Sequence, residues 1–345
     1  MQRAFSRHWA RLLAAVLPLG TALPALGVSC MTQSQMAGEQ RTILAQSAQM
    51  LAANVESGNA AAVQAQTIPA VASQFGGIAN SIQQISTSIQ HATLTVDALY
   101  ILDATDLKAA QESQFFCGVP GSALTVEVTI PNLPPGKYAL AIVHATGVKQ
   151  PQQLSLVLQN EPAGSPNWKL AGFFTRPMML GGHDGLWFWR QARDYAAKKQ
   201  TGPAYFYYQT ALNLLEPVDF LSSPNLQKLQ KETEQSRPDQ LPGAEPMRLN
   251  AGSQTFQITN VHVGEFADQL DLIVTYSATP GLDPVSARAQ VTAVMRAMLQ
   301  QYPGLQEAFH GLWVYAATPG NANPFALELP MQQIQASASA GGQHS

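Results

Sequence analysis

Residues 166–231 read PNWKLAGFFTRPMMLGGHDGLWFWRQARDYAAKKQTGPAYFYYQTALNLLEPVDFLSSPNLQKLQK and contain three of the five tryptophans. Residues 168–174 are apolar and aromatic, which predicts a strand. Pro177 ends it, because proline has no N–H to donate to a sheet. After the break GGHDG the apolar residues follow a helical period. This stretch therefore joins a strand-rich half to a mixed C-terminal half.

Start and stop signals divide the rest of the stretch into helices. Asp184 is a natural N-cap for a helix over 185–200, because its carboxylate can accept the free amides of the first turn. Gly202 can supply a left-handed exit. Pro203 suits the first position of a second helix, which Pro217 closes. A third helix is expected to begin at residue 222 or 223 and to run to about residue 231.

Six positions of the first two helices resemble one tetratricopeptide-type hairpin, with Pro217 one place later than in that pattern. They are Phe188, Ala192, Tyr195, Ala204, Tyr208 and Ala211. The sequence shows no second copy, and such repeats need about three stacked units to be stable alone. We therefore expect the hairpin to pack on another part of the chain and to dock two domains together. Peptide binding by the hairpin is the alternative.

Length and composition limit the range of functions. At 345 residues the chain can form two or three domains with cores of their own. Only 12% of its residues are charged and its net charge is −3. No face concentrates basic residues, so nucleic acid is not an expected partner.

The N-terminus is typical of an exported bacterial protein. Arg3, Arg7 and Arg11 precede an apolar segment over 12–26 that is too short and too interrupted by proline to form a stable membrane span. We expect residues 1–29 to be a signal peptide and the protein to reach the cell envelope or periplasm. No other segment is long and apolar enough to cross a bilayer.

Cys30 has two alternative fates, of which a lipid anchor is the one we expect. Residues 26–30 (LGVSC) resemble a lipobox, with Gly27 in place of the usual leucine, which implies an acylated Cys30 and a lipid anchor in the membrane. Alternatively, the chain is cleaved near Gly27 or Ser29 and secreted, and Cys30 pairs with the other cysteine, Cys117. The alternatives exclude each other, because an acylated Cys30 has no free thiol.

An α+β domain is expected over residues 41–178, after a tether at 30–40. Helical patterns cover 42–57 and 68–89, with a short helix between them after the turn at Gly58 and Asn59. From residue 93 the period changes to two, which predicts a run of antiparallel strands. These expected strands are 93–102, 114–119, 124–130, 136–145, 153–158 and 168–174.

Two phrases in this domain resemble the nuclear-transport-factor-2-like family. ESGNAAAVQAQ at 56–66 is similar to a small-residue helix turn of that family, and NWKLAGFF at 167–174 is similar to its final strand. The resemblance implies helices covering a curved antiparallel sheet to make a cone. Members include enzymes, ligand binders and scaffolds, so this fold does not settle function.

The remaining chain divides into three parts. Residues 179–231 hold the hairpin and its extra helix, and the polar, proline-containing residues 232–247 form a linker. Residues 248–335 predict a second, smaller α+β domain with a β-α-β core, in which Asp283 caps a helix from Pro284. We expect the tail over 336–345 to be disordered.

Few residues suggest chemistry. His183 and Asp184 follow the last strand of the cone and could supply a general base, with Trp187 and Arg190 as ligand contacts; helix capping explains the same residues. Asp97 could face the cone interior and act in proton transfer.

Aromatic and histidine residues add one further candidate surface. Tyr205 and Tyr207 belong to the run YFYY at 205–208, of which two members are expected in the core and two toward solvent or a neighbouring domain, where they could bind a ligand. His144, His262 and His310 are isolated, with no metal-ligand spacing. No motif for a metal, nucleotide or other cofactor is recognisable.

The sequence favours a non-enzymatic binding or scaffold protein, contacting a protein or a small molecule through the cone or the hairpin. The alternative is a small-molecule hydrolase or isomerase that uses the cone interior. Inward-facing Asp97 or His183 in a closed pocket would favour the enzyme. An interior filled by Phe116, Leu124 and Val126 would favour the scaffold.

Overall fold

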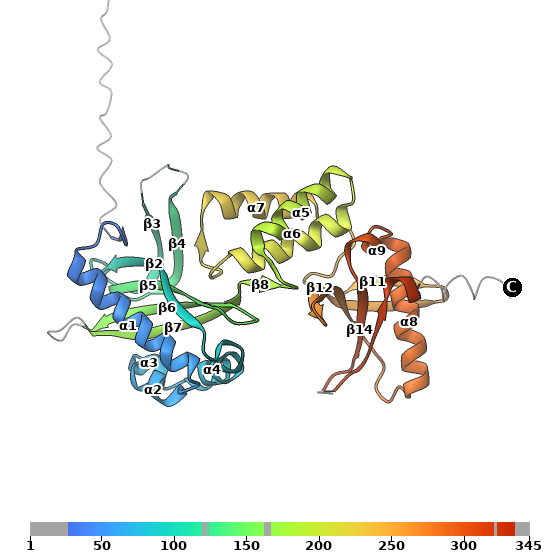
Figure 1. Cartoon of the computed structure of the whole chain (residues 1–345), viewed down its shortest axis with the longest axis horizontal. Coiled ribbons are helices and arrows are strands. Elements are labelled where there is room, and N and C mark those ends of the chain that lie inside the picture. The colour runs from blue at the N-terminus through green and yellow to red at the C-terminus, as the bar shows by residue number, and fades with distance from the viewer. Residues whose placement is uncertain (1–26, 119–121, 123, 162–166, 321–322, 335–345) are drawn as a thin grey trace, which may run out of the picture.

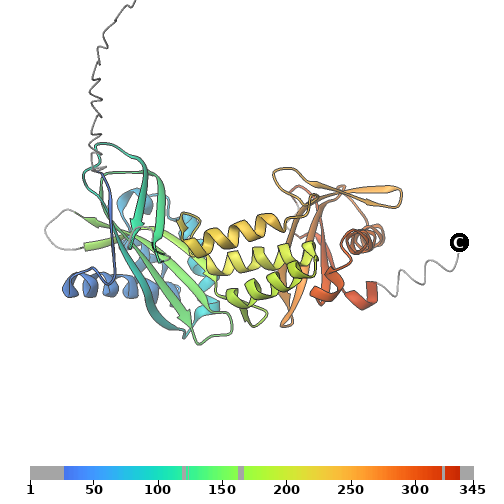
Figure 2. The same ribbon diagram turned by 90° about the horizontal axis from the view of Figure 1, so that it is seen from above.

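The computed structural model describes residues 27–118, 122, 124–161, 167–320 and 323–334. The predicted signal peptide up to residue 26 and the predicted tail lie outside them. The fold is α+β, as predicted, with mostly antiparallel sheets and separate helices. An N-terminal domain and a C-terminal domain lie at opposite ends, with three helices between them (Figures 1 and 2). Within the described residues no helix is long and apolar enough to cross a membrane.

The N-terminal domain is built on a five-stranded antiparallel sheet. Its order is β1-β2-β5-β6-β7. The strands are β1 (Ser29–Thr32), β2 (Thr93–Ala104), β5 (Gly136–Thr146), β6 (Gln152–Glu161) and β7 (Asn167–Pro177). A bulge in β2 interrupts its register with β5 between Val96 and Ala98. A second bulge, in β7, interrupts the register with β6 opposite Val157 and Leu158. Such bulges bend a sheet and increase its twist.

Four helices cover one face of this sheet: α1 (Gly38–Glu56), α2 (Ala60–Ala65), α3 (Pro69–Ala72) and α4 (Gly76–Ile89). Asn59 caps α2 by accepting a hydrogen bond from Ala62 N at 3.1 Å, at the turn expected there. The single helix expected over 68–89 is wrong, because the chain leaves the helix between Ala72 and Gly76. Two adjacent glycines, at 76 and 77, have low helix propensity and lie at this break.

A second sheet covers the opposite face. Its order is β10-β4-β3, from β3 (Gln111–Cys117), β4 (Val126–Leu133) and the two-residue strand β10 (Leu221–Ser222). Phe115 is 1% exposed and Phe116 is 53% exposed, so the interior between the sheets holds Phe115. Of the three residues whose burial would favour a scaffold, Val126 packs against this core, whereas Phe116 and Leu124 are exposed.

The helical unit consists of α5 (Gly185–Ala197), α6 (Thr201–Leu215) and α7 (Pro224–Gln235), preceded by the hairpin β8 (Met179–Leu180) and β9 (His183–Asp184). The predicted caps are confirmed: Asp184 Oδ1 accepts from Trp187 N at 2.7 Å, and Ser223 Oγ from Leu226 N at 3.3 Å. The left-handed residue after α5 is Lys199, with φ 60°, rather than Gly202, which lies inside α6.

The C-terminal domain is a five-stranded sheet with one long helix. Its order is β11-β12-β13-β14-β15, and only β13 and β14 are parallel, joined through α8 as the predicted β-α-β core requires. Asp283 caps α8 through the amides of Val285 and Ser286. The elements are β11 (Met247–Ala251), β12 (Gln254–Phe266), β13 (Gln269–Ser277), α8 (Pro284–Gln301), α9 (Leu305–Ala308), β14 (Gly311–Ala317) and β15 (Phe325–Pro330).

The helical unit contacts both domains. The buried residues of α5 and α6 share one apolar core with the C-terminal sheet and α8. In the other direction Leu221 of β10 pairs with Val128 of β4, and Leu226 of α7 belongs to the core between the two N-terminal sheets. The expected docking role of the hairpin thus has a structural counterpart in these two cores.

Candidate functional site

The predicted catalytic pair lies at the start of α5. The His183 imidazole stacks on the Trp187 indole, with ring centroids 3.7 Å apart and planes 7° from parallel, and Phe188 meets both rings edge-on. The Asp184 carboxylate is used as the helix cap. The structure therefore brings His183 and Trp187 together as a packed aromatic pair.

The other charged candidates are also outside a closed pocket. Asp97 has a side chain that is 56% exposed, and its Oδ1 is 3.8 Å from His144 Nδ1, beyond hydrogen-bond length. Asp97 lines a wide, open hollow of about 480 Å³ beside Cys117. Burial, and then the charge of Asp97, raise the pKa of Tyr100, which lines the same hollow. Arg190 is exposed on α5.

The aromatic residues at 205–208 of α6 are buried in the hydrophobic core. All four residues at 205–208 are less than 5% exposed, because α6 is enclosed by α5, α7 and the C-terminal domain. Tyr207 Oη donates to Ala308 O at 2.8 Å, and Tyr205 Oη accepts from Gln209 Nε2 at 2.7 Å. The ligand-binding surface expected at Tyr205 and Tyr207 is therefore replaced by packing between elements.

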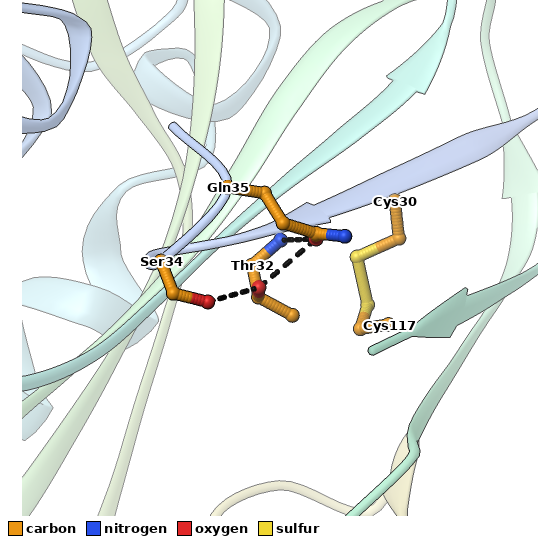
Figure 3. Close-up of a disulfide and its surroundings, with 5 residues drawn as sticks. All are labelled: Cys30, Thr32, Ser34, Gln35 and Cys117. Atoms are coloured by element: carbon orange, nitrogen blue, oxygen red, sulfur yellow. Dashed lines mark hydrogen bonds between the residues drawn. A yellow bond between two sulfur atoms is a disulfide. The ribbon is translucent and has the colours of Figure 1, made fainter. Parts of the chain in front are cut away.

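Cys30 is joined to Cys117 by a disulfide (Figure 3). Cys30 lies in β1, the edge strand that pairs antiparallel with β2, and Cys117 is the last residue of β3 in the second sheet. Figure 3 also shows Thr32 and Gln35 hydrogen-bonded just beyond β1, where the chain turns toward α1. In this state Cys30 has no thiol for acylation, and the bond is the one that the second alternative predicts.

An apolar cavity of the N-terminal domain lies between its two sheets. Its volume is about 260 Å³. β4, β5, β6 and β7 supply most of the lining, and Phe220 meets Phe174 edge-to-face at 5.3 Å on one side. We call it the inter-sheet cleft; its lining residues are Ile68, Ile130, Asn132, Leu133, Pro134, Tyr138, Val157, Gln159, Ala171, Gly172, Phe174 and Phe220.

Local backbone features open this cleft. Val157 of β6 pairs with Gly172 and Leu158 with Leu170, so Ala171 is the extra residue of the bulge in β7. Bulges occur often beside binding sites, because they redirect side chains. Gly172 adds no side chain, and a Cβ there would lie 3.3 Å from the Phe174 ring and 3.4 Å from Val157 Cβ. The cleft therefore depends on a bulge and on a small residue.

Few polar groups face the inter-sheet cleft. Tyr138 Oη donates to Pro134 O at 3.1 Å, and burial raises the pKa of this tyrosine, so it stays neutral. Asn132 and Gln159 supply neutral amides to the lining. No aspartate, glutamate, lysine, arginine or histidine is among the lining residues. The arrangement suits a neutral, apolar or aromatic group that makes one or two hydrogen bonds, as small-molecule sites commonly do.

Comparisons with protein family models, with curated proteins and with solved structures gave no match to this chain. Sequence analysis did not find the inter-sheet cleft either. Its lining comes from segments between residues 68 and 220, and only the closing strand NWKLAGFF was singled out. The adjacent small residues Ala171 and Gly172 inside an apolar strand are the signal that marks the bulge.

Proposed function

We propose that this chain is an exported, non-enzymatic binding protein whose N-terminal domain holds an apolar ligand in the inter-sheet cleft. The observation that carries the proposal is the lining of the cleft. Three aromatic side chains and several aliphatic ones surround it, two neutral amides face it, and none of its lining residues is an acid, a base or a histidine. Ligand pockets have this balance of many apolar and few polar groups.

The position of the charged candidates supports binding rather than catalysis. A general base must be within hydrogen-bond reach of the proton that it abstracts. Asp97 and His183 lie outside the cleft, one largely exposed and the other stacked on Trp187. The cleft therefore offers no carboxylate, amine or imidazole with which a hydrolase or isomerase could begin proton transfer.

Export is supported by the composition of the N-terminus and by the disulfide. A basic segment followed by a short apolar one is typical of a signal peptide, and disulfides persist in oxidising compartments. We therefore place the protein in the cell envelope or periplasm, or outside the cell. A lipid anchor on Cys30 would require the form in which Cys117 has no partner.

We further propose that the N-terminal domain is a variant of the nuclear-transport-factor-2-like fold, and that the hairpin is a docking unit similar to a single tetratricopeptide repeat. Helices packed on one face of a bent antiparallel sheet support the first likeness. The buried positions 188, 192, 204, 208 and 211 support the second. In contrast to an open cone, a second sheet covers the other face.

Binding of the apolar dye Nile red tests the proposal. We expect saturable fluorescence enhancement in the wild-type chain and its loss in Ala171→Trp, which fills the cleft from the bulge. Val157→Phe, from the neighbouring strand, should weaken binding in the same way. Ala109→Trp places the same side chain in an exposed loop and should bind as wild type. Equal binding in all four proteins, with unchanged circular dichroism, would overturn the proposal.

A further inference from the structure

Three side chains that are far apart in the sequence meet at one end of the C-terminal sheet. Asp271 is in β13, His310 directly precedes β14, and Glu328 is in β15. The parallel register places Asp271 opposite Gly311, the residue after His310. Asp271 alternates along β13 with Leu272, which belongs to the apolar core, so the cluster lies on the other face of the sheet.

The three groups are close enough to share one ion. One ligand atom from each residue lies within 4.8 Å of the other two. His310 Nδ1 and Asp271 Oδ1 are 3.2 Å apart. Two ligand atoms held tetrahedrally at about 2.0–2.1 Å from a zinc ion are separated by about 3.3 Å. The Asp271–His310 pair already has that spacing, and Glu328 completes three ligands after a small side-chain movement.

Two oxygen atoms of the cluster are buried without a partner. The side chain of Asp271 is 1% exposed. Among the described residues, no hydrogen-bond partner is found for Asp271 Oδ2 or for the buried Glu328 Oε1. Leaving a buried carboxylate oxygen unsatisfied is costly. Burial raises the pKa of both carboxyl groups, and the charge of Asp271 raises that of Glu328 further. A positive charge between them would remove this cost.

The backbone around the cluster is fixed and leaves room at its centre. His310 N donates to Leu270 O at 2.8 Å, and His310 O accepts from Met331 N at 2.9 Å. A Cβ on Gly311 would lie 2.8 Å from Glu328 Oε1 and 3.1 Å from Asp271 Oδ1. Glycine is thus the residue that lets the two carboxylates approach, and any larger residue there would occupy the space between them.

We propose that Asp271, His310 and Glu328 form a binding site for a divalent transition-metal cation, with Zn²⁺ as the best match. One imidazole nitrogen and two carboxylate oxygens are a ligand set that zinc accepts, whereas Ca²⁺ and Mg²⁺ favour oxygen ligands alone. The His310 side chain is 41% exposed, which leaves a side open for water or for another ligand at a fourth position. This site is in a different domain from the inter-sheet cleft and stands independently of it.

The competing occupant is a proton shared by the two carboxyl groups. Like charges this close disfavour the state in which both carboxyl groups are ionised, and a proton held by one of them would relieve the repulsion. A metal site and a shared proton predict opposite effects when Glu328 is replaced by a neutral residue. Removing this charge abolishes a metal site, whereas it relieves a proton-sharing pair.

Isothermal titration calorimetry with zinc chloride tests the proposal. The tag-free, disulfide-bonded chain is first treated with a chelator, which is then removed. We expect one Zn²⁺ per chain, at least tenfold weaker binding in Glu328→Gln and His310→Gln, and weaker binding of Ca²⁺ than of Zn²⁺. His262→Gln changes an exposed histidine of the adjacent strand β12 and should leave the affinity unchanged. Asp271→Asn is the fourth variant, with circular dichroism as the check of folding.

Several results would overturn the metal site. Absence of saturable Zn²⁺ binding would do so, as would wild-type affinity in a folded Glu328→Gln protein or tighter binding of Ca²⁺ than of Zn²⁺. A thermal midpoint that rises in Glu328→Gln, with no heat of zinc binding in the wild type, would assign the cluster to a shared proton. If Asp271→Asn does not fold, the variants of the partly buried Glu328 and the exposed His310 still decide the question.

Discussion

Cys30 and Cys117 are bonded to each other across 87 residues of sequence, and they join β1 of one sheet to β3 of the other. β1 is a four-residue strand at the edge of its sheet. Without the bond only its pairing with β2 and the packing of its side chains would hold it. The disulfide thus fixes the beginning of the described chain to the interior between the two N-terminal sheets.

Replacing both cysteines by serine should destabilise the protein by about 2–5 kcal/mol, because the cross-link restricts a long loop in the unfolded chain. Urea unfolding followed by circular dichroism would show a lower midpoint. Dithiothreitol should shift the wild-type midpoint in the same direction and leave the double variant unaffected. A wild-type midpoint that does not respond to the reductant would contradict the disulfide.

Mass spectrometry of the protein purified from cells should identify the fate of Cys30 directly. We expect a non-reducing digest to contain one peptide pair that joins Cys30 to Cys117, and this pair should separate on reduction. A Cys30 peptide that carries a diacylglycerol would instead establish the lipid anchor and would leave Cys117 as a free, buried thiol. The protein for this digest should be expressed with its natural N-terminus, so that any cleavage or acylation by the cell can take place.

Glu232 links α5 to α7. Its carboxylate accepts from Arg193 Nε and Nη2, both at 2.9 Å, and from Trp189 Nε1 at 2.7 Å. The Arg193 guanidinium also lies 4.5 Å from the centre of the Trp189 ring. Burial acts to raise the pKa of Glu232, but hydrogen bonds from Arg193 and Trp189 outweigh it and hold this pKa below its ordinary value of 4.5.

Glu232→Gln should therefore destabilise the protein at pH 7 by about 1.5–3 kcal/mol, the usual contribution of a hydrogen bond to a charged group. A lowered pKa contributes stability that is complete above pH 4.5 and is lost as the pH falls through the folded-state value. The difference between variant and wild type should shrink below pH 4.5 in urea unfolding. Glu234→Gln, on the exposed side of α7, should change the free energy of unfolding at pH 7 less than Glu232→Gln.

Alternation and capping residues predicted most elements of this fold. The N-caps Asp184, Ser223 and Asp283 lie where the sequence placed them, since a cap depends only on neighbours within one turn. The sheet order and the position of the second sheet depend on pairing between distant segments. β10, for example, comes from residue 221 and pairs with β4 near residue 128. Such pairings have no local signal.

Burial of the aromatic residues in α6 likewise depends on segments that are distant in the sequence. A helix with one neighbour buries one face, which predicts two exposed residues among four consecutive ones. α6 has neighbours on several sides, so all four residues at 205–208 are buried. The cluster of Asp271, His310 and Glu328 was missed for a related reason. His310 is isolated in the sequence, and parallel pairing of β13 with β14 brings it to Asp271.

Tyr207→Phe should weaken the attachment of the helical unit to the C-terminal domain. The Tyr207 hydroxyl donates to Ala308 O, and substitution would leave that carbonyl without this donor at a buried position. The expected loss is about 1–2 kcal/mol in thermal or urea unfolding. Tyr315→Phe removes a hydroxyl from a partly exposed ring on β14 and should cost less. Equal effects of the two variants would contradict the role of the Tyr207 bond.

Gly185 and Gly77 are two glycines in helices for which opposite effects of alanine are expected. Gly185 begins α5, and a Cβ there would lie 2.5 Å from Leu215 Cγ and 3.1 Å from Leu214 Cβ at the end of α6. Gly77 is in the first turn of α4, and a Cβ there would have no heavy atom within 4 Å. Neither residue has a positive φ, so the two differ in packing and not in backbone strain.

Gly185→Ala should destabilise the protein by about 1–3 kcal/mol, because leucine side chains at the junction of α5 and α6 must move to admit the methyl group. Gly77→Ala should stabilise it by about 0.5–1 kcal/mol, since alanine loses less backbone entropy than glycine on entering a helix. Urea unfolding of both variants measures the two effects. Unchanged stability in Gly185→Ala would mean that Leu215 adapts freely, and that the close approach of α5 to α6 does not depend on glycine.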